Sequence, residues 1–170
     1  MNSIVLNLLG AFQAKVEGWP VPHFANAKVR ALLSYLALES AHAHERVRLV
    51  ALLWPQLSSE SALDNLRKSI YRLHQTLDQA APNVTPLVAV TRHTLHFVAP
   101  PATVDVLNFQ TLLAQTHVHQ HPSITNCDAC LARLTLAVEL YQGELLAGFG
   151  LPDAPAFEEW LLLWRESLWA

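Results

Sequence analysis

The chain has 170 residues, of which 52% are hydrophobic and 15% are charged, and its formal net charge is −3. This composition is typical of a folded globular protein and excludes an intrinsically disordered chain. No apolar run approaches the roughly 18 residues that a membrane-spanning helix needs, and the N-terminal sequence lacks the basic segment and cleavage site of a signal peptide. With only two cysteines, the sequence predicts a cytoplasmic protein with no membrane partner.

The charge is distributed unevenly along the chain. Residues 1–98 contain nine lysines and arginines against six acidic residues, whereas residues 99–170 contain two against eight. Such asymmetry indicates two parts with different partners. The positive excess of the first part is small, so a single copy would contact few phosphates and would bind nucleic acid weakly at physiological salt.

The chain begins with two short β-prone segments, Ile4–Leu9 and Phe12–Val16, separated by Gly10-Ala11. Small residues of this kind mark a turn, so the two segments predict an antiparallel pair. Residues 18–22 contain two prolines and are too Pro-rich for a central strand, because proline cannot donate a ladder hydrogen bond. The sequence therefore predicts an N-terminal antiparallel sheet of two or three strands.

Two helices are predicted after this sheet. Residues 27–39 carry apolar side chains at the helical period and follow an asparagine that can cap the first turn. A second helix is predicted over residues 45–53, because a proline follows it closely. Its inward-facing side chains are expected to be Val47, Val50, Ala51 and Trp54. His42 and His44, between the two helices, are expected on the surface.

Residues 58–77 form the most regular pattern in the chain. Leucines and an isoleucine recur there at steps of three and four, which predicts an amphipathic helix. The apolar stripe consists of Leu63, Leu66, Ile70, Leu73 and Leu77. The opposite face bears Ser61, Asp64, Asn65, Lys68, Arg72 and Gln75, with Arg67 at its edge. Asn, Gln, Lys and Arg read base edges or bind phosphates, but an ordinary core helix also exposes a polar face to solvent.

A β-hairpin is predicted next. Residues 87–90 and 95–98 are strand-like and flank Thr91-Arg92-His93-Thr94 as the turn. Arg92 and His93 at the tip of a hairpin are suited to a narrow, electronegative minor groove. The first part of the chain is therefore predicted to be a sheet, three helices and a hairpin.

Pro100-Pro101 breaks the pattern and predicts a boundary between a domain over 1–99 and a domain over 102–170. The second domain is predicted to be all-helical. Its helices are expected over residues 105–115, over 128–146 and from 155 to the last residue. The last helix carries a stripe of Trp160, Leu161, Trp164, Leu168 and Trp169. This stripe either closes the core of its own domain or forms a dimer interface.

Cys127 and Cys130, together with nearby histidines, form a cluster with metal-ligand spacing. Thiolates and imidazoles at short spacing are ligands that zinc prefers, and four of them would close a structural site. The candidate ligands are Cys127, Cys130, His119 and His121. The alternatives are a redox-active cysteine pair, or two half-buried thiols beside an exposed histidine-rich loop. No other cofactor is expected.

The sequence contains none of the motifs expected of an enzyme. A nucleophile elbow, a zincin motif and a Gly-rich phosphate loop are all missing from it. The sequence therefore predicts a protein without catalytic residues.

Several motifs together resemble the bacterial antibiotic regulatory protein family of transcriptional activators. They are KVRALLSYLALE at 28–39, LLWP at 52–55, ALDNLRKSIYRLHQTL at 62–77, TRHTLHF at 91–97, VDVLNF at 104–109, AVELYQGELLAGF at 137–149 and FEEWLLLWRE at 157–166. The resemblance covers nearly the whole chain in the family's order. It implies an α+β fold, in which an OmpR-like winged-helix domain precedes an all-α, tetratricopeptide-like bacterial transcriptional activator domain.

The resemblance also implies a function, that of a sequence-specific DNA-binding regulator. In such proteins the third helix enters the major groove of double-stranded DNA and the hairpin tip enters the minor groove. The residues that it assigns to DNA are Ser61, Asn65, Arg67, Lys68, Arg72, Gln75, Arg92 and His93. Asp64 is expected to hold Arg67 or Lys68 in place.

For the second domain, the resemblance implies contact with RNA polymerase, with a second copy of the chain or with a downstream sensor domain. Activator domains of the family are usually longer than the roughly 70 residues found here, which favours a truncated domain or a short protein that forms a homodimer. The alternative function is a protein-interaction module whose winged helix does not bind DNA. The pI of about 6.3 and the acidic second part keep that alternative open.

Overall fold

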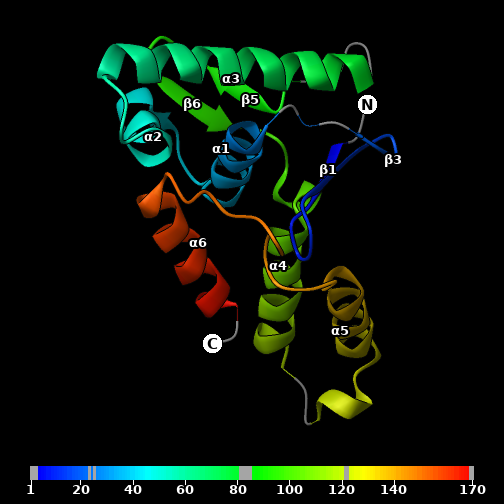
Figure 1. The fold of residues 1–170 in the computed structure, drawn as a ribbon. Helices are drawn as coiled ribbons and strands as arrows, with labels where there is room; N and C mark the ends of the chain where they lie inside the picture. Colours follow the sequence, from blue (N-terminus) through cyan, green and yellow to red (C-terminus); the bar gives the residue numbers. More distant parts are fainter. Residues whose placement is uncertain (1–3, 23, 25, 81–85, 121–122, 169–170) are drawn as a thin grey trace.

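The computed structural model describes residues 4–22, 24, 26–80, 86–120 and 123–168 (Figure 1). Over these residues the chain has a mixed α/β fold with six α-helices and two small antiparallel sheets. The first sheet contains β1 (Ile4–Asn7), β2 (Gln13–Val16) and β3 (Trp19–Pro20), in that order. The second contains β4 (His44–Glu45), β6 (Thr94–Phe97) and β5 (Val88–Val90), with β6 in the middle. The helices are α1 (Ala27–Leu38), α2 (Arg46–Leu53), α3 (Ser59–Ala80), α4 (Asp105–Val118), α5 (Asp128–Leu140) and α6 (Pro155–Ser167).

The N-terminal sheet is the one that the sequence predicts. Ile4 lies opposite Val16 and Leu6 lies opposite Ala14, so the buried side chains of β1 and β2 share one face. Gly10, between the two strands, has a φ of 120°, a conformation that favours glycine because it has no Cβ. β3 pairs with β2 alone and is an edge strand, as expected of a proline-containing segment.

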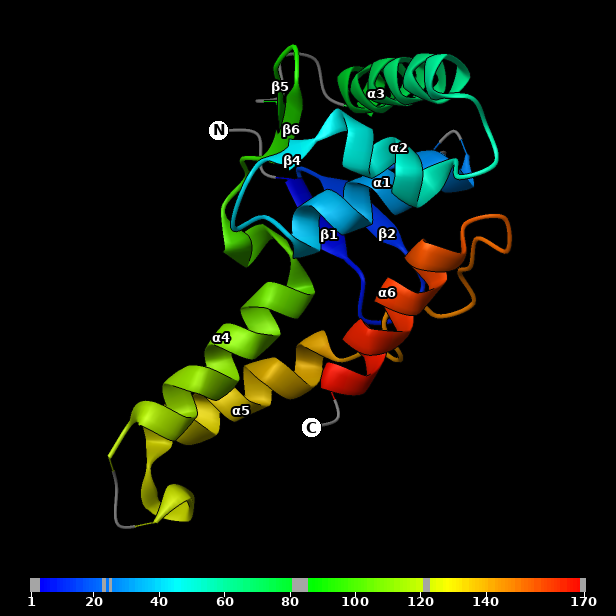
Figure 2. The ribbon, with the colours of Figure 1, turned by 90° about the vertical axis from the view of Figure 1, so that its left-hand side faces the viewer.

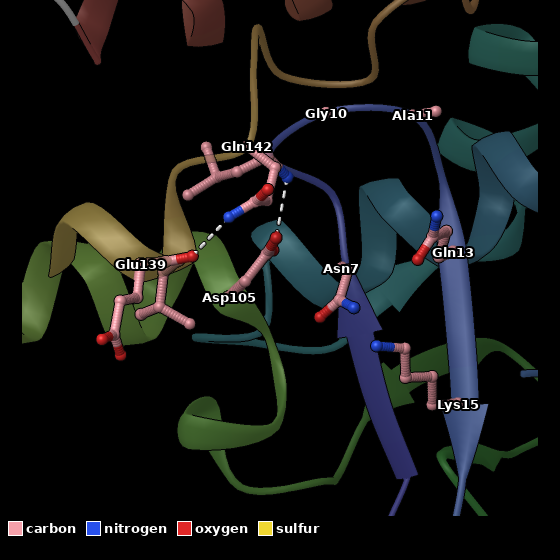
Figure 3. Close-up of a pocket in the computed structure, with 10 residues that line it drawn as sticks. Asn7, Gly10, Ala11, Gln13, Lys15, Asp105, Glu139 and Gln142 are labelled. Carbon is pink, nitrogen blue, oxygen red and sulfur yellow. Dashed lines mark hydrogen bonds between the residues drawn. The ribbon is translucent and has the colours of Figure 1, made fainter. Parts of the chain in front are cut away.

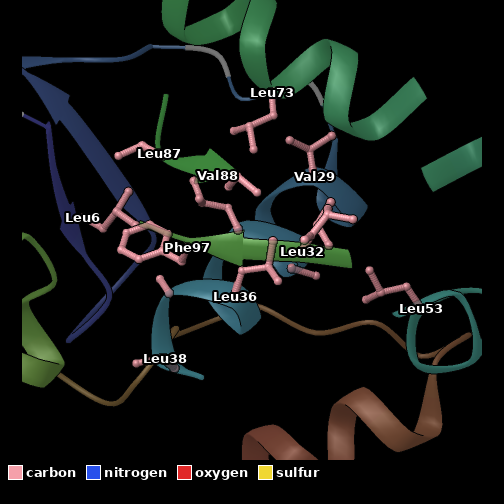
Figure 4. Close-up of a cluster of buried hydrophobic side chains, with 14 of the residues drawn as sticks. Leu6, Val29, Leu32, Leu36, Leu38, Leu53, Leu73, Leu87, Val88 and Phe97 are labelled. Atoms are coloured by element: carbon pink, nitrogen blue, oxygen red, sulfur yellow. The ribbon is translucent and has the colours of Figure 1, made fainter. Parts of the chain in front are cut away.

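The first three helices form where the sequence predicts them. The side chain of Asn26 caps α1 by accepting a hydrogen bond from the backbone N–H of Val29. α3 buries Leu66, Leu73 and Leu77 and packs against α1 and α2. Figure 4 shows the resulting core, in which side chains of α1 meet those of α3, β5 and β6. Burial of this stripe fixes which face of α3 points to solvent.

The buried face of α2 agrees with the prediction in part. Val50 and Trp54 are buried as predicted, but Leu49 and Leu53 are buried in place of Val47, which is 64% exposed, and Ala51, which is exposed. The helix follows directly on β4, a two-residue strand that the sequence analysis missed, and pairing of β4 with β6 sets the direction in which α2 starts. The face that this orientation buries carries two leucines, which remove more apolar area from water than the predicted valine and alanine.

His44 lies in β4 and is buried, not on the surface as predicted. Its Nε2 atom is 2.8 Å from the backbone oxygen of Glu39, which accepts the hydrogen bond. The ring also contacts Tyr35 edge-on, with a distance of 5.2 Å between the ring centroids. His44 therefore packs β4 against the end of α1.

In the second part of the chain, α4 and α5 lie side by side and run in opposite directions (Figure 2). α4 continues to Val118, three residues beyond the predicted end. α5 ends at Leu140, six residues before the predicted Leu146. The chain leaves the helix there because residues 144–147 bond to the loop between β1 and β2 instead. In that loop, Gly10 donates to the oxygen of Glu144 and accepts from Ala147, and Leu8 accepts from Leu146.

The stripe of large apolar side chains on α6 packs within the chain. Phe157 and Leu161 are buried, and Trp160, Trp164 and Leu168 are half-buried against the same core. Trp169 lies outside the described residues. The described part of this stripe packs on α1 and α2, in the first part of the chain, and not on the other helices of its own predicted domain.

Two carboxylates join the two parts of the chain. The carboxylate of Asp105, at the start of α4, accepts hydrogen bonds from the backbone N–H groups of Leu8 and Leu9 at 2.8 Å. The Oε1 atom of Glu39, after α1, accepts from the indole N–H groups of Trp160 and Trp164, both at 2.8 Å. These contacts cross the boundary that the sequence predicts at residues 99–102, and the division into two domains stays a prediction.

No helix in the described ranges is both long and apolar enough to cross a membrane.

Candidate nucleic-acid interface

The outward face of α3 is a continuous polar surface that the core leaves free. α3 has 22 residues, which corresponds to a length of about 33 Å at 1.5 Å per residue. In Figures 1 and 2, α3 and the β5–β6 hairpin occupy the end of the molecule opposite the connection between α4 and α5. The predicted residues of α3 all face solvent: Ser61, Arg67, Lys68, Arg72 and Gln75 are exposed, and Asn65 is half-buried.

Lys68 is held by an acidic neighbour one turn away. Its Nζ atom lies 2.7 Å from Oδ2 of Asp64, at the i,i+4 spacing, which confirms the role expected of Asp64. The hydrogen bond and the charge of Lys68 lower the pKa of the Asp64 carboxyl group. Within the part of the chain that the structure describes, Arg67 and Arg72 form no salt bridge. Their charges are therefore more available to an anion than that of Lys68.

Two shallow depressions follow this face of α3. One, of about 470 Å³, is lined by Arg67, Lys68, Tyr71, Arg72 and Gln75. The other, of about 290 Å³, lies where α3 meets the start of α1, and its lining includes Asn26, Lys28, Asn65 and Arg72. Both are lined by cations and amides, which suit an anionic ligand that also offers hydrogen-bonding edges.

The turn of the β5–β6 hairpin is ordered by its own side chains. The Oγ1 atom of Thr91 accepts hydrogen bonds from the backbone N–H groups of His93 and Thr94, at 3.2 and 2.9 Å. This arrangement leaves the predicted tip residues, Arg92 and His93, exposed. The hairpin therefore presents a cation and an imidazole on a defined turn.

Arg46 is a residue of this surface that the sequence does not predict. Its guanidinium group donates two hydrogen bonds to the backbone oxygen of Thr91, at 3.2 and 2.8 Å, and its backbone N–H donates to the oxygen of His93. Arg46 thereby attaches the turn to the start of α2. The sequence holds no signal for this contact, because both acceptors are backbone carbonyl groups more than 40 residues away.

A cavity of about 500 Å³ lies between the β1–β2 loop and the end of α5 (Figure 3). Its polar lining includes Asn7, Gln13, Lys15 and Gln142. The carboxylate of Asp105 at its edge is already bound by backbone N–H groups. No serine, cysteine or histidine is among the described lining residues, so these residues contain no Ser–His or Cys–His pair.

Three of the four candidate metal ligands come together in the structure. The Nδ1 atom of His119 lies 3.1 Å from Sγ of Cys130 and 3.4 Å from Sγ of Cys127. The fourth candidate, His121, lies outside the described residues. This cluster is far from α3, at the opposite end of the molecule (Figure 2).

The fold is also found in a solved protein. A structure described as Mycobacterium tuberculosis EmbR in complex with a low-affinity phosphopeptide superposes with a TM-score of 0.76 and 21% sequence identity, over 98% of this chain. The chain spans 43% of the length of that EmbR chain. No protein-family model matches the sequence, and no curated protein matches it. At this level of identity, the likeness to EmbR establishes the fold.

Proposed function

We propose that the chain is a sequence-specific DNA-binding regulator of transcription. The observation that carries this proposal is the outward face of α3, where Asn65, Lys68 and Arg72 lie on a rigidly packed helix at the same end of the molecule as an exposed basic hairpin turn. A helix followed by a hairpin in this arrangement corresponds to the recognition helix and wing of a winged helix. The motif resemblance to antibiotic regulatory proteins and the fold shared with EmbR support the same conclusion.

In the proposed complex, α3 enters the major groove. Asn65, Arg72 and Gln75 are the side chains whose hydrogen-bonding groups match base edges: Asn and Gln match adenine, and Arg matches guanine. Ser61, Arg67 and Lys68 bind phosphates and fix the register of the helix. Lys68 first has to leave Asp64 or share its charge.

The hairpin tip makes the second contact, with the adjacent minor groove. Arg92 supplies the charge that a narrow minor groove attracts, and His93 adds a hydrogen-bonding group. Arg46 holds this turn against α2, so binding of the tip does not have to order a free loop. The hairpin tip and α3 then contact the DNA from the same end of the molecule.

The second part of the chain serves protein contacts in this proposal. It carries most of the negative charge of the chain, which opposes binding to DNA and suits a basic protein surface. RNA polymerase and a second copy of the chain are the partners that fit a regulator, and most of the acidic side chains that would meet them lie in residues 144–166, after α5.

Substitutions on α3 test the proposed interface. Arg72→Ala is expected to weaken binding to the specific DNA site about tenfold and to reduce the preference for that site over scrambled DNA. Lys68→Ala is expected to weaken binding to all sequences alike and to lower the salt dependence. Fluorescence anisotropy with DNA tiled across the protein's own upstream region measures both effects.

Lys15→Ala is the matched control for these variants, since Lys15 is a half-exposed cation of β2, in the N-terminal sheet. Its affinity for DNA is expected to equal that of the parent. If Arg72→Ala and Lys68→Ala both bind as tightly as the parent does, α3 is not the DNA-binding helix. Absence of DNA binding in the parent would favour the protein-interaction module instead.

A further inference from the structure

Three side chains with metal-binding atoms converge where α4 ends and α5 begins. His119 is the C-terminal cap residue of α4, Cys127 is the N-terminal cap residue of α5, and Cys130 lies in the first turn of α5. Their ligand atoms, Nδ1 of His119 and the two Sγ atoms, all lie within 4.8 Å of one another. They are the only such group of three that the described residues contain.

The distances from Nδ1 of His119 to the two sulfurs are near those of a tetrahedral zinc site, and slightly shorter. With a Zn–S distance of about 2.3 Å and a Zn–N distance of about 2.0 Å, two ligand atoms in a tetrahedral site are roughly 3.5 to 3.8 Å apart. The two N···S distances, 3.1 and 3.4 Å, are close to this value. A site with three protein ligands leaves the fourth position to water or another small ligand, as zinc sites of this kind do.

Polar groups approach both thiols. The backbone N–H of Cys130 donates to the Cys127 sulfur. Arg133 approaches the Cys130 sulfur, with 3.9 Å between Nη1 and Sγ. A bound dication further stabilises both thiolates and releases their protons.

A disulfide between Cys127 and Cys130 is the main alternative for the same residues. Both cysteines are free in the structure. A redox pair needs the two sulfurs alone and gives no reason for an imidazole to lie within hydrogen-bonding distance of both. His119 comes from a different helix, eight residues before Cys127, and its approach to both sulfurs is what a shared metal requires.

We propose that His119, Cys127 and Cys130 bind one zinc ion, which ties the end of α4 to the start of α5. The effect that we expect of the ion is on stability, although the site keeps one open position, because it lies at the far end of the α4–α5 pair, away from α3 (Figure 2). It acts as a crosslink between two helix ends that are also joined by a loop, whose described residues include a short 3₁₀ turn, Ile124–Asn126. This proposal is independent of DNA binding.

Titration of the full chain with cobalt(II), under a non-thiol reductant, tests the site directly. The parent is expected to bind one equivalent with the visible absorption of a tetrahedral cobalt thiolate, and zinc is expected to displace it. His119→Ala is expected to weaken cobalt binding at least tenfold, since even loss of a residue that only orients a ligand costs about 10- to 100-fold. His119 is exposed, so this variant is expected to fold.

His117→Ala is the matched control, because His117 is an exposed histidine two residues away that does not belong to the cluster. Its cobalt affinity is expected to equal that of the parent. A zinc chelator is expected to lower the unfolding temperature of the parent and of His117→Ala, but not that of His119→Ala. The proposal is overturned if the reduced parent binds less than one equivalent of cobalt, or if His119→Ala binds it as tightly as the parent does.

Discussion

Replacement of Asp105 by alanine is expected to lower the free energy of unfolding by about 3 kcal/mol. Asp105 is 4% exposed, and its carboxylate accepts hydrogen bonds from the backbone N–H groups of Leu8, Leu9 and Val106. Without the carboxylate these donors lose their partner, and a buried donor without a partner costs about 1–3 kcal/mol. Burial raises the pKa of the Asp105 carboxyl group, and the same N–H donors oppose that rise. Replacement by alanine also removes the cost of burying a carboxylate, which offsets part of the expected loss of unfolding free energy.

Urea denaturation followed by circular dichroism measures this effect. Asp105→Asn is expected to lie between alanine and the parent, because it keeps one acceptor oxygen but places an NH₂ group near an N–H donor. Asp78→Ala, on the exposed end of α3, is the control and is expected to change stability by less than about 0.5 kcal/mol. Equal denaturation midpoints for Asp105→Ala and Asp78→Ala would show that the carboxylate does not join the N-terminal sheet to α4.

Leu66→Ala is expected to destabilise the protein by about 3 kcal/mol, within the range for a buried leucine that leaves a cavity. Leu66 is fully buried on the side of α3 that packs towards α1 and α2. The cavity would also loosen the helix whose outward face is proposed to bind DNA. Thermal unfolding of Leu66→Ala, compared with that of a matched variant on the outward face of α3, separates the packing of the helix from its proposed contact with DNA.

That matched variant is Tyr71→Ala. Tyr71 is 67% exposed and lines the depression on the outward face of α3, so its removal is expected to change stability by less than about 0.5 kcal/mol and to weaken DNA binding. If Tyr71→Ala unfolded at a lower temperature than Leu66→Ala, α3 would pack through its polar face, which would contradict the structure.

Features set by local sequence could be predicted. The apolar period of residues 63–77 identified α3 and its buried face, because side chains at steps of three and four meet on one side of a helix whatever the rest of the chain does. The cap at Asn26 and the turn at Thr91–Thr94 are also local, since each residue bonds to a neighbour within three positions. The orientation of the α3 residues proposed to contact DNA follows from this local pattern.

Features set by distant contacts could not be predicted. α5 was expected to continue to Leu146, but Leu146 bonds to Leu8 instead, and the helical period carries no information about that partner. The pairing of β4 with β6 and the guanidinium contacts of Arg46 likewise depend on backbone groups about 45 or more residues away. For His119, Cys127 and Cys130, the spacing in the sequence indicated possible metal ligands, but only the fold shows that His119 lies close to both sulfurs.

Salt-dependent binding to DNA tests the central claim most directly. The measurement is fluorescence anisotropy of the full chain with DNA tiles from its own upstream region, each repeated at several salt concentrations. The account predicts that one tile binds more tightly than scrambled DNA. It also predicts that the logarithm of the association constant falls with the logarithm of salt, with a slope between about −2 and −4, as two to four phosphate contacts require. Equal, salt-independent binding to every tile, or no binding, would contradict it.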